Sequence, residues 1–78
     1  MLWKGAPSTP LVSIATTKIF ADVLKENGFN SVVSLCQGDG VEIGELMCND
    51  PRIPLISFTG STKVGRIVNQ TVSKRFGK

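Results

Sequence analysis

The 78-residue sequence contains no histidine and no tyrosine, and it has only two cysteines. Histidine is the commonest partner in zinc sites and in cysteine–histidine nucleophiles, so its absence removes the usual basis for both. Cys36 and Cys48 are not spaced as a Cys-x-x-Cys pair, and we interpret both as small buried hydrophobic residues in a reduced compartment. The six carboxylates lie mainly on predicted helix surfaces or turns. We therefore expect no catalytic residue and no metal ligand in this chain.

Long apolar runs are also missing. No segment approaches the roughly 18 apolar residues that a membrane span needs, and no apolar run follows a basic stretch at the N-terminus. We therefore expect a soluble, intracellular protein without a membrane partner. With 41% hydrophobic residues the chain can form one small unit, but a fold of this size buries only about 60% of its unfolded surface and is marginally stable.

The net charge of +3 is unevenly distributed. Residues 1–51 carry three lysines and all six acidic residues, whereas the chain from Arg52 onward carries six basic residues and no acidic one. A basic half can indicate nucleic-acid binding, but these charges are spread out and few aromatic residues lie among them. We favour a solvated helix face beside an anionic ligand or an acidic neighbour, and expect no nucleic-acid partner.

Apolar periodicity predicts helices at residues 10–26, 41–48 and 62–75, and strands at residues 2–4, 31–36 and 53–58. Pro54 places the start of the last strand at an entrance or an edge. Strands that alternate with helices imply a parallel sheet with right-handed crossovers. We therefore expect an α/β fold. The pattern begins inside one element and stops after a helix, so we also expect the chain to be part of a larger domain.

Two of the predicted helices have clear signals. The first carries Val12, Ala15, Ile19 and Val23 on one face, which we expect to be buried. It should begin with Ser8 or Thr9 as N-cap and end at Asn27-Gly28. The third helix should bury a face that ends shortly before Gly77, and this face consists of Val64, Ile67, Val68 and Val72.

Ligands of open parallel sheets gather where a strand ends and a helix begins. Three such places exist, at residues 4–7, 38–40 and 58–62. In the third, Gly60 lets the backbone approach a phosphate, and Ser61 or Thr62 either binds it or simply caps the helix; the simple cap is slightly favoured. Lys4 can meet ribose hydroxyls or be an ordinary surface lysine. At residues 38–40 an ordinary turn is favoured, because the spacing departs from the dinucleotide fingerprint.

Three segments resemble motifs of the aldehyde dehydrogenase superfamily. Residues 57–65, Ser-Phe-Thr-Gly-Ser-Thr-Lys-Val-Gly, resemble its F-T-G-S-x-x-x-G motif, residues 3–9 resemble its lysine-containing strand end, and residues 33–40 resemble its glycine turn. The likeness covers essentially the whole chain. The Trp-Lys-Gly-Ala-Pro run at residues 3–7 and the Arg-Phe-Gly run at residues 75–77 are similar to the antiquitin branch, the α-aminoadipic semialdehyde dehydrogenases of lysine breakdown.

This resemblance implies a Rossmann-like parallel sheet with flanking helices, as an incomplete βαβαβα part of a three-layer α/β/α domain. It also implies a cofactor, NAD, whose contacts would be Lys4 at the adenosine ribose, Gly38 and Gly40 on the adenine side, Gly60 and Ser61 at the pyrophosphate, and Val64 near the adenine. Pro7 stands where many relatives have an acidic residue that contacts the ribose, which leaves the choice between NAD and NADP less defined.

The resemblance further implies that residues 1–78 are a partial NAD-binding domain, without the catalytic and oligomerisation domains. The family's oxyanion-hole asparagine would precede Met1, and its glutamate and nucleophilic cysteine would follow Lys78. We expect the whole protein to be an NAD-dependent oxidoreductase that converts an aldehyde, plausibly α-aminoadipic semialdehyde, to its acid. It would be a homo-oligomer, a tetramer, in the cytoplasm or mitochondria, and residues 1–78 alone would be inactive. The alternative is a non-catalytic nucleotide- or phosphate-binding module.

Overall fold

A computed structural model describes all 78 residues and divides them into two compact units, Met1–Gly40 and Val41–Lys78. The first unit contains strand β1 (Leu2–Lys4), helix α1 (Pro10–Glu26) and strand β2 (Ser34–Cys36). The second contains helices α2 (Glu42–Asn49) and α3 (Thr62–Lys74). None of these helices is long and apolar enough to cross a membrane.

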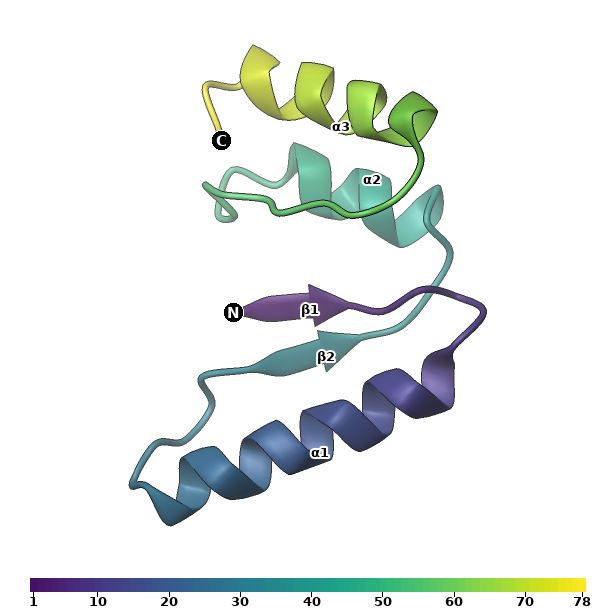
Figure 1. The fold of residues 1–78 in the computed structure, drawn as a ribbon. Helices are drawn as coiled ribbons and strands as arrows, with labels where there is room; N and C mark the ends of the chain where they lie inside the picture. Colours follow the sequence, from purple (N-terminus) through teal and green to yellow (C-terminus); the bar gives the residue numbers. More distant parts are fainter. The chain divides into compact units, whose positions relative to one another are not determined.

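The first unit is a βαβ motif. Strands β1 and β2 run parallel and side by side, with Trp3 opposite Leu35 and Lys4 opposite Cys36, and α1 joins them along one face (Figure 1). Parallel strands need such a crossover because a tight turn cannot connect them. The predicted α/β class and parallel pairing are confirmed for this unit, and α1 has the predicted bounds.

Strand β2 is shorter than the predicted 31–36. Before Ser34, the residues of this segment pair only with Met1. The Ser34 N–H donates to the Met1 C=O at 2.9 Å, and the Met1 amino group donates to the Val32 C=O at 2.6 Å. Ser31 has a left-handed backbone with φ of 57°, which turns the chain out of the extended conformation. The β-branched run at residues 31–36 indicated a strand, but a strand persists only where a neighbouring backbone pairs with it.

The predicted buried face of α1 is wrong. Val12, Ile19 and Val23 are 63%, 66% and 51% exposed. The face toward the strand pair is instead the one that carries Ser13, which is only 3% exposed, together with half-buried Leu24.

Apolar periodicity misled the assignment because α1 has apolar residues on two faces. Ser13 is small and lies against Gly5: a Cβ on Gly5 would come within 2.7 Å of the Ser13 Cβ. This close approach lets the first turn of α1 lie against the residue that follows β1. The Ser13 hydroxyl is satisfied within the helix because it donates to the Thr9 C=O at 3.2 Å, so its burial leaves no unpaired polar group.

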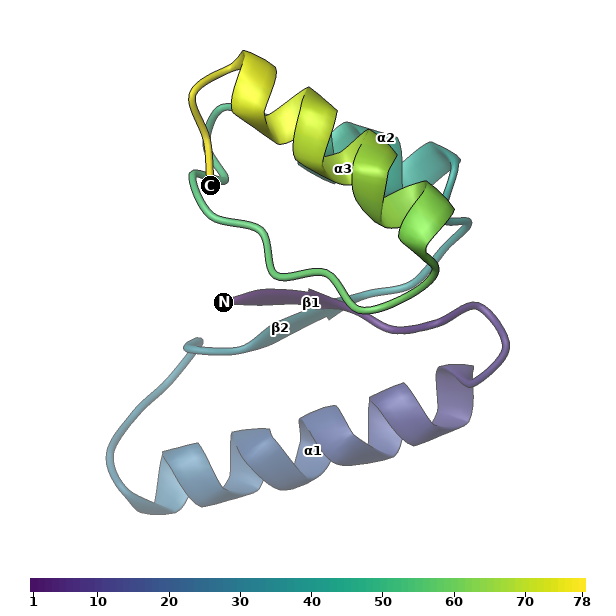
Figure 2. The same cartoon turned by 45° about the horizontal axis from the view of Figure 1, so that its top comes forward.

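In the second unit α2 and α3 lie side by side in both views (Figures 1 and 2). Helix α2 begins and ends one residue later than predicted. Asp50 follows it and accepts from Arg52 at 2.6 Å. Hydrogen bonds from the Arg52 side chain, more than any other cause, lower the pKa of Asp50 to about 2. The short turn after α2 is therefore held by a charged pair beside Pro51.

The predicted strand at residues 53–58 does not form as a strand. The segment is extended, but its pairing is confined to Lys78, which donates its N–H to the Pro54 C=O at 2.9 Å and accepts from the Ile56 N–H at 2.6 Å. One residue bonded to two alternate residues in this way is a single step of a parallel ladder. The apolar sequence suits a strand, but within this unit no longer backbone edge pairs with it.

Both long helices end in a Schellman motif, with different residues in its left-handed position. After α1, Gly28 has φ of 83°, and the N–H of Phe29 donates to the Leu24 C=O at 2.9 Å. After α3, Phe76 has φ of 61°, and the N–H of Gly77 donates to the Val72 C=O at 2.9 Å. Gly77 lies beyond the helix as predicted, but the strained backbone position belongs to a phenylalanine.

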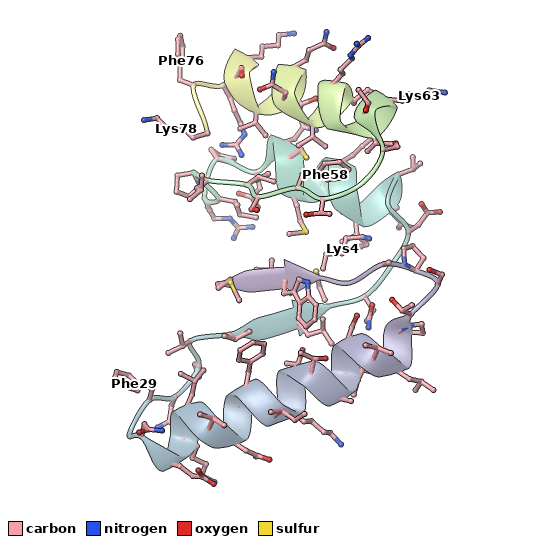
Figure 3. All side chains as sticks on the ribbon, in the orientation of Figure 1. Lys4, Phe29, Phe58, Lys63, Phe76 and Lys78 are labelled. Carbon is pink, nitrogen blue, oxygen red and sulfur yellow. The ribbon has the colours of Figure 1, made fainter.

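Replacing Phe76 by glycine is expected to stabilise the second unit by about 1 kcal/mol, because glycine adopts the left-handed conformation without the steric cost borne by other residues. The ring contributes little packing, since Phe76 is 96% exposed and points away from α3 (Figure 3). Thermal unfolding followed by circular dichroism measures the change. Phe76→Ala, which removes the ring and keeps the strain, is the control; equal stabilisation by alanine would contradict this explanation.

Neither unit has a closed core. The first unit buries Gly5 and Ser13, and the second buries Cys48 and Val72. On α3 the predicted apolar face is buried only at Val72, whereas Ile67 is 52% exposed. Large exposed apolar surfaces mark places where further protein packs. The low burial agrees with the marginal stability expected from the length.

Candidate functional site

Lys4 is the last residue of β1, as predicted for a lysine at a strand end (Figure 3). It is half-buried, and its Nζ donates to the Gly5 C=O at 3.2 Å. The ammonium therefore rests on the loop that leads into α1. The ammonium places a positive charge at this end of the strand pair.

The tight turn predicted after β2 does not form at residues 37–39. Gly38 is two residues beyond β2 and at the same end of the strand pair as Lys4, so the structure brings these two predicted residues to one edge. Gly40 has open space where a Cβ would stand, and its φ is not positive. Neither packing nor backbone geometry within the chain therefore requires glycine at position 40.

The second group of predicted residues lies at the start of α3, in the other unit. Ser61 is the N-cap, and its Oγ accepts from the Val64 N–H at 3.3 Å. The predicted helix cap at Ser61 is therefore confirmed. It leaves the hydroxyl hydrogen available as a donor, and the N–H groups of Thr62 and Lys63 have no partner within the helix. Capping and anion binding are compatible at this position. Val64 follows one turn on and is 44% exposed.

The glycines of the F-T-G-S-x-x-x-G segment have a packing role that the sequence analysis missed. The Phe58 ring lies over both of them: a Cβ on Gly60 would come within 2.6 Å of the ring, and one on Gly65 within 3.5 Å. The ring thus lies against the first turn of α3. The sequence did contain a signal for this packing, because Phe58 lies two positions before Gly60 and seven before Gly65. A ring that lies against a helix needs residues without a Cβ beneath it.

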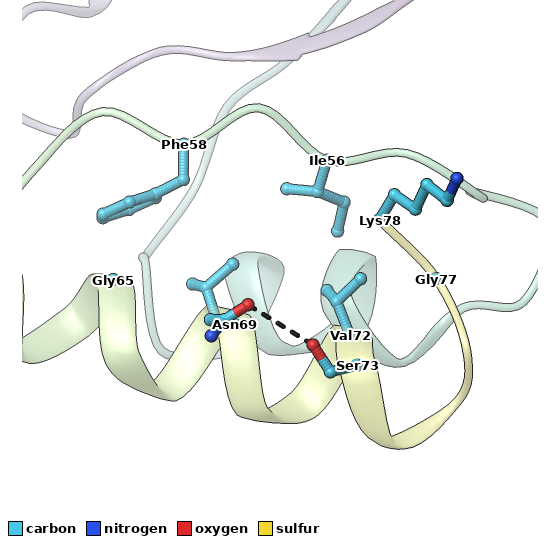
Figure 4. A pocket seen from close by; sticks show the side chains of 9 residues that line it. Ile56, Phe58, Gly65, Asn69, Val72, Ser73, Gly77 and Lys78 are labelled. Atoms are coloured by element: carbon cyan, nitrogen blue, oxygen red, sulfur yellow. Dashed lines mark hydrogen bonds between the residues drawn. The ribbon is translucent and has the colours of Figure 1, made fainter.

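A cavity of ≈ 300 Å³ lies between the extended segment and α3 (Figure 4). Ile56 and Phe58 line one side, and Val72 lines the other. On the helix the Ser73 hydroxyl donates to Asn69 Oδ1 at 3.3 Å. None of the predicted site residues lines this cavity. Its mainly apolar wall is the interior of the second unit, not an extension of the predicted ligand site.

The thiol of Cys48 is buried at the end of α2. Burial raises its pKa above the ordinary value, although the charge of Arg75 opposes this effect. A thiol held in its neutral form is a poor nucleophile. No three cysteine, aspartate or glutamate side chains gather as a metal site would require.

A parallel βαβ unit and a serine-capped helix that follows a glycine turn define an α/β protein. The sequence profile of the aldehyde dehydrogenase family matches residues 1–78. The chain belongs to the aldehyde dehydrogenase family.

Curated relatives narrow this likeness to the antiquitin group, as the sequence motifs indicated. The chain is 54% identical over its whole length to aldehyde dehydrogenase family 7 member A1 of Malus domestica, and 51% identical to family 7 member B4 of Arabidopsis thaliana. It is 51% identical over 99% of its length to the α-aminoadipic semialdehyde dehydrogenase of Mus musculus. It spans 15% of the Malus protein and 14% of the mouse protein.

Proposed function

We propose that residues 1–78 are part of the NAD-binding domain of an NAD-dependent aldehyde dehydrogenase and hold the adenosine and pyrophosphate of NAD. The observation that carries this proposal is the start of α3, where a serine cap with a free O–H and two free backbone N–H groups follows the F-T-G turn. The family membership of the whole chain supports it. When bound, NAD supplies the hydride acceptor for aldehyde oxidation.

Six residues are the proposed contacts of NAD. Lys4 would donate to the ribose hydroxyls, with Gly38 and Gly40 beside the adenine. On α3, the hydroxyl of Ser61 and the helix dipole would stabilise the negative pyrophosphate, while Gly60 allows close approach of the backbone. Val64, half-exposed one turn into the helix, would pack on the adenine. These assignments fit the chemistry of the groups: donors and a positive field for phosphate, and an apolar side chain for a base.

The remaining properties are proposed from the name of one relative and from the family resemblance. α-Aminoadipic semialdehyde is the proposed substrate, because a mouse relative carries it in its name. We further propose a complete three-layer Rossmann-like domain, a homotetramer, and a location in the cytoplasm or mitochondria. NAD is proposed over NADP because the chain resembles the antiquitin branch, which uses NAD. Pro7 stands where many relatives have an acidic residue, so no carboxylate there would repel the 2′-phosphate of NADP.

The test uses the full-length enzyme that carries residues 1–78. Lys4→Met and Ser61→Ala should each raise the dissociation constant of NAD about 10-fold, because each removes a hydrogen bond to a charged or polar group of the cofactor. Calorimetric titration with NAD measures the change. Lys18→Met, at an exposed lysine on α1, is the matched control and should leave NAD affinity unchanged.

Unchanged NAD affinity in both variants would contradict the assignment of the site. The wild-type enzyme should also produce NADH from α-aminoadipic semialdehyde, whereas residues 1–78 alone should not. NAD binding by the full-length protein without aldehyde oxidation would favour a non-catalytic nucleotide-binding module instead.

A further inference from the structure

The side chain of Gln37 lies beside the loop that follows Lys4 and is hydrogen-bonded to its helix end. Lys4 is paired with Cys36, so Gln37 and Gly5 are the next residues of the two neighbouring strands. The Gln37 Oε1 lies 3.6 Å from the position that a Cβ on Gly5 would take. Its Nε2 donates to the Pro10 C=O at 3.1 Å, across 27 residues of sequence. Gln37 therefore hydrogen-bonds the loop where it enters α1 and lies near Gly5, where the loop leaves β1.

The loop at residues 5–9 has few other restraints at its helix end. Thr9 is the N-cap of α1 but makes no side-chain cap, and proline at the first helical position has no N–H to donate. A turn bond from the Thr9 N–H to the Ala6 C=O at 3.1 Å closes the loop locally without tying it to the sheet. The Pro10 C=O can accept from Gln37 as well as from the helix, because a carbonyl has two lone pairs.

Lys4 depends on the same loop, because its Nζ rests on the Gly5 C=O. A shift of residues 5–9 would therefore move the carbonyl that orients the ammonium. We propose that Gln37 is a positioning residue for the adenosine end of the cofactor: from the end of β2 it holds the loop that joins β1 to α1, and thereby holds Lys4 in its binding orientation. This inference rests on the proposed function of Lys4.

Gln37→Met in the full-length enzyme keeps the length of the side chain and removes its donor. It should raise the KM for NAD, and the inhibition constant of AMP competing with NAD, about 5-fold, the loss expected for one hydrogen bond. The kcat should stay within about 2-fold, because the reacting end of the cofactor is not touched. AMP is the informative probe, since it carries only the adenosine and one phosphate.

Gln37→Glu is the second variant, because it keeps the size and places a carboxylate against the Pro10 carbonyl; it should weaken AMP binding at least as much. Gln70→Met, at an exposed glutamine on α3, is the matched control and should change neither constant. Unchanged AMP inhibition in both Gln37 variants would overturn the proposal. A fall in kcat and melting temperature with no change in the inhibition constant of AMP would overturn it as well. If Lys4→Met and Ser61→Ala also leave NAD affinity unchanged, the proposed function itself fails; if Lys4→Met weakens AMP binding and Gln37→Met does not, only the positioning role fails.

Discussion

Replacing Arg75 by methionine is expected to destabilise the second unit by about 2–4 kcal/mol, since two charge-assisted hydrogen bonds are lost together. The Arg75 Nε donates to the Cys48 C=O at 2.7 Å and its Nη2 to the Ile53 C=O at 2.7 Å. The first carbonyl lies at the C-terminal end of α2, which has no basic residue in its own last turn. Arg75 therefore supplies from α3 the cation that this helix end lacks.

Loss of the guanidinium would leave two partly buried carbonyls without their donor, which is why the effect should exceed that of an ordinary surface pair. The loss of stability is measured on residues 1–78 as a fall in the helical circular dichroism signal and in the urea concentration at the midpoint of unfolding. Lys74→Met, at an exposed cation one residue earlier, is the matched control and should change stability little. Arg75→Lys should recover only part of the loss, because an ammonium does not reproduce the planar fork. A methionine variant as stable as wild type would contradict this role.

Gly5→Ala is expected to destabilise the first unit by about 1–3 kcal/mol, the usual cost of overpacking. The new Cβ would stand 1.9 Å from the Ser13 Oγ and 2.7 Å from the Ser13 Cβ. The Ser13 Oγ can rotate away about χ1, but the two Cβ atoms are fixed by their backbones, so the first turn of α1 must move away from β1. NAD affinity of the full-length enzyme should fall with it, because Lys4 rests on the same loop.

The double variant Gly5→Ala with Ser13→Gly tests the cause directly. Ser13→Gly alone should cost about 1 kcal/mol as a glycine inside a helix. If the clash is the cause, the double variant should be more stable than the sum of the two single changes predicts. Gly44→Ala, where no atom lies within 4 Å of the new Cβ, is the control and should not destabilise α2. Strict additivity in the double variant would contradict the packing explanation. Thermal unfolding of each variant supplies the measurement.

Local signals located the helices well. Pro10 and Asn27-Gly28 bound α1 where the structure has its ends, and Ser61 caps α3 as expected. These signals are local because a cap or a turn is decided by a few adjacent backbone groups. The family likeness was equally visible, since the F-T-G-S-x-x-x-G motif is contiguous in sequence. Membership of the aldehyde dehydrogenase family confirms it.

Features that join distant segments were not predictable in this way. The sequence did not predict the contacts of Gln37 and Arg75: the hydrogen bond of Gln37 crosses 27 residues of sequence, and those of Arg75 cross 27 and 22. Residues 53–58 have the composition of a strand, but a strand requires a paired backbone edge and only Lys78 pairs with them in this chain. The positions of site residues along the chain could thus be proposed, whereas the contacts that hold them could not.

The sequence by itself determined the order of helices and turns, the parallel α/β character and the family, because each depends on adjacent residues or on a contiguous motif. Only the tertiary structure decided which face of α1 lies on the strands. The reason is steric: Gly5 and Ser13 allow close approach on one face, and periodicity alone cannot rank two apolar faces of one helix. The same holds for Gly60 and Gly65, whose clearance is set by a ring that only the fold places above them.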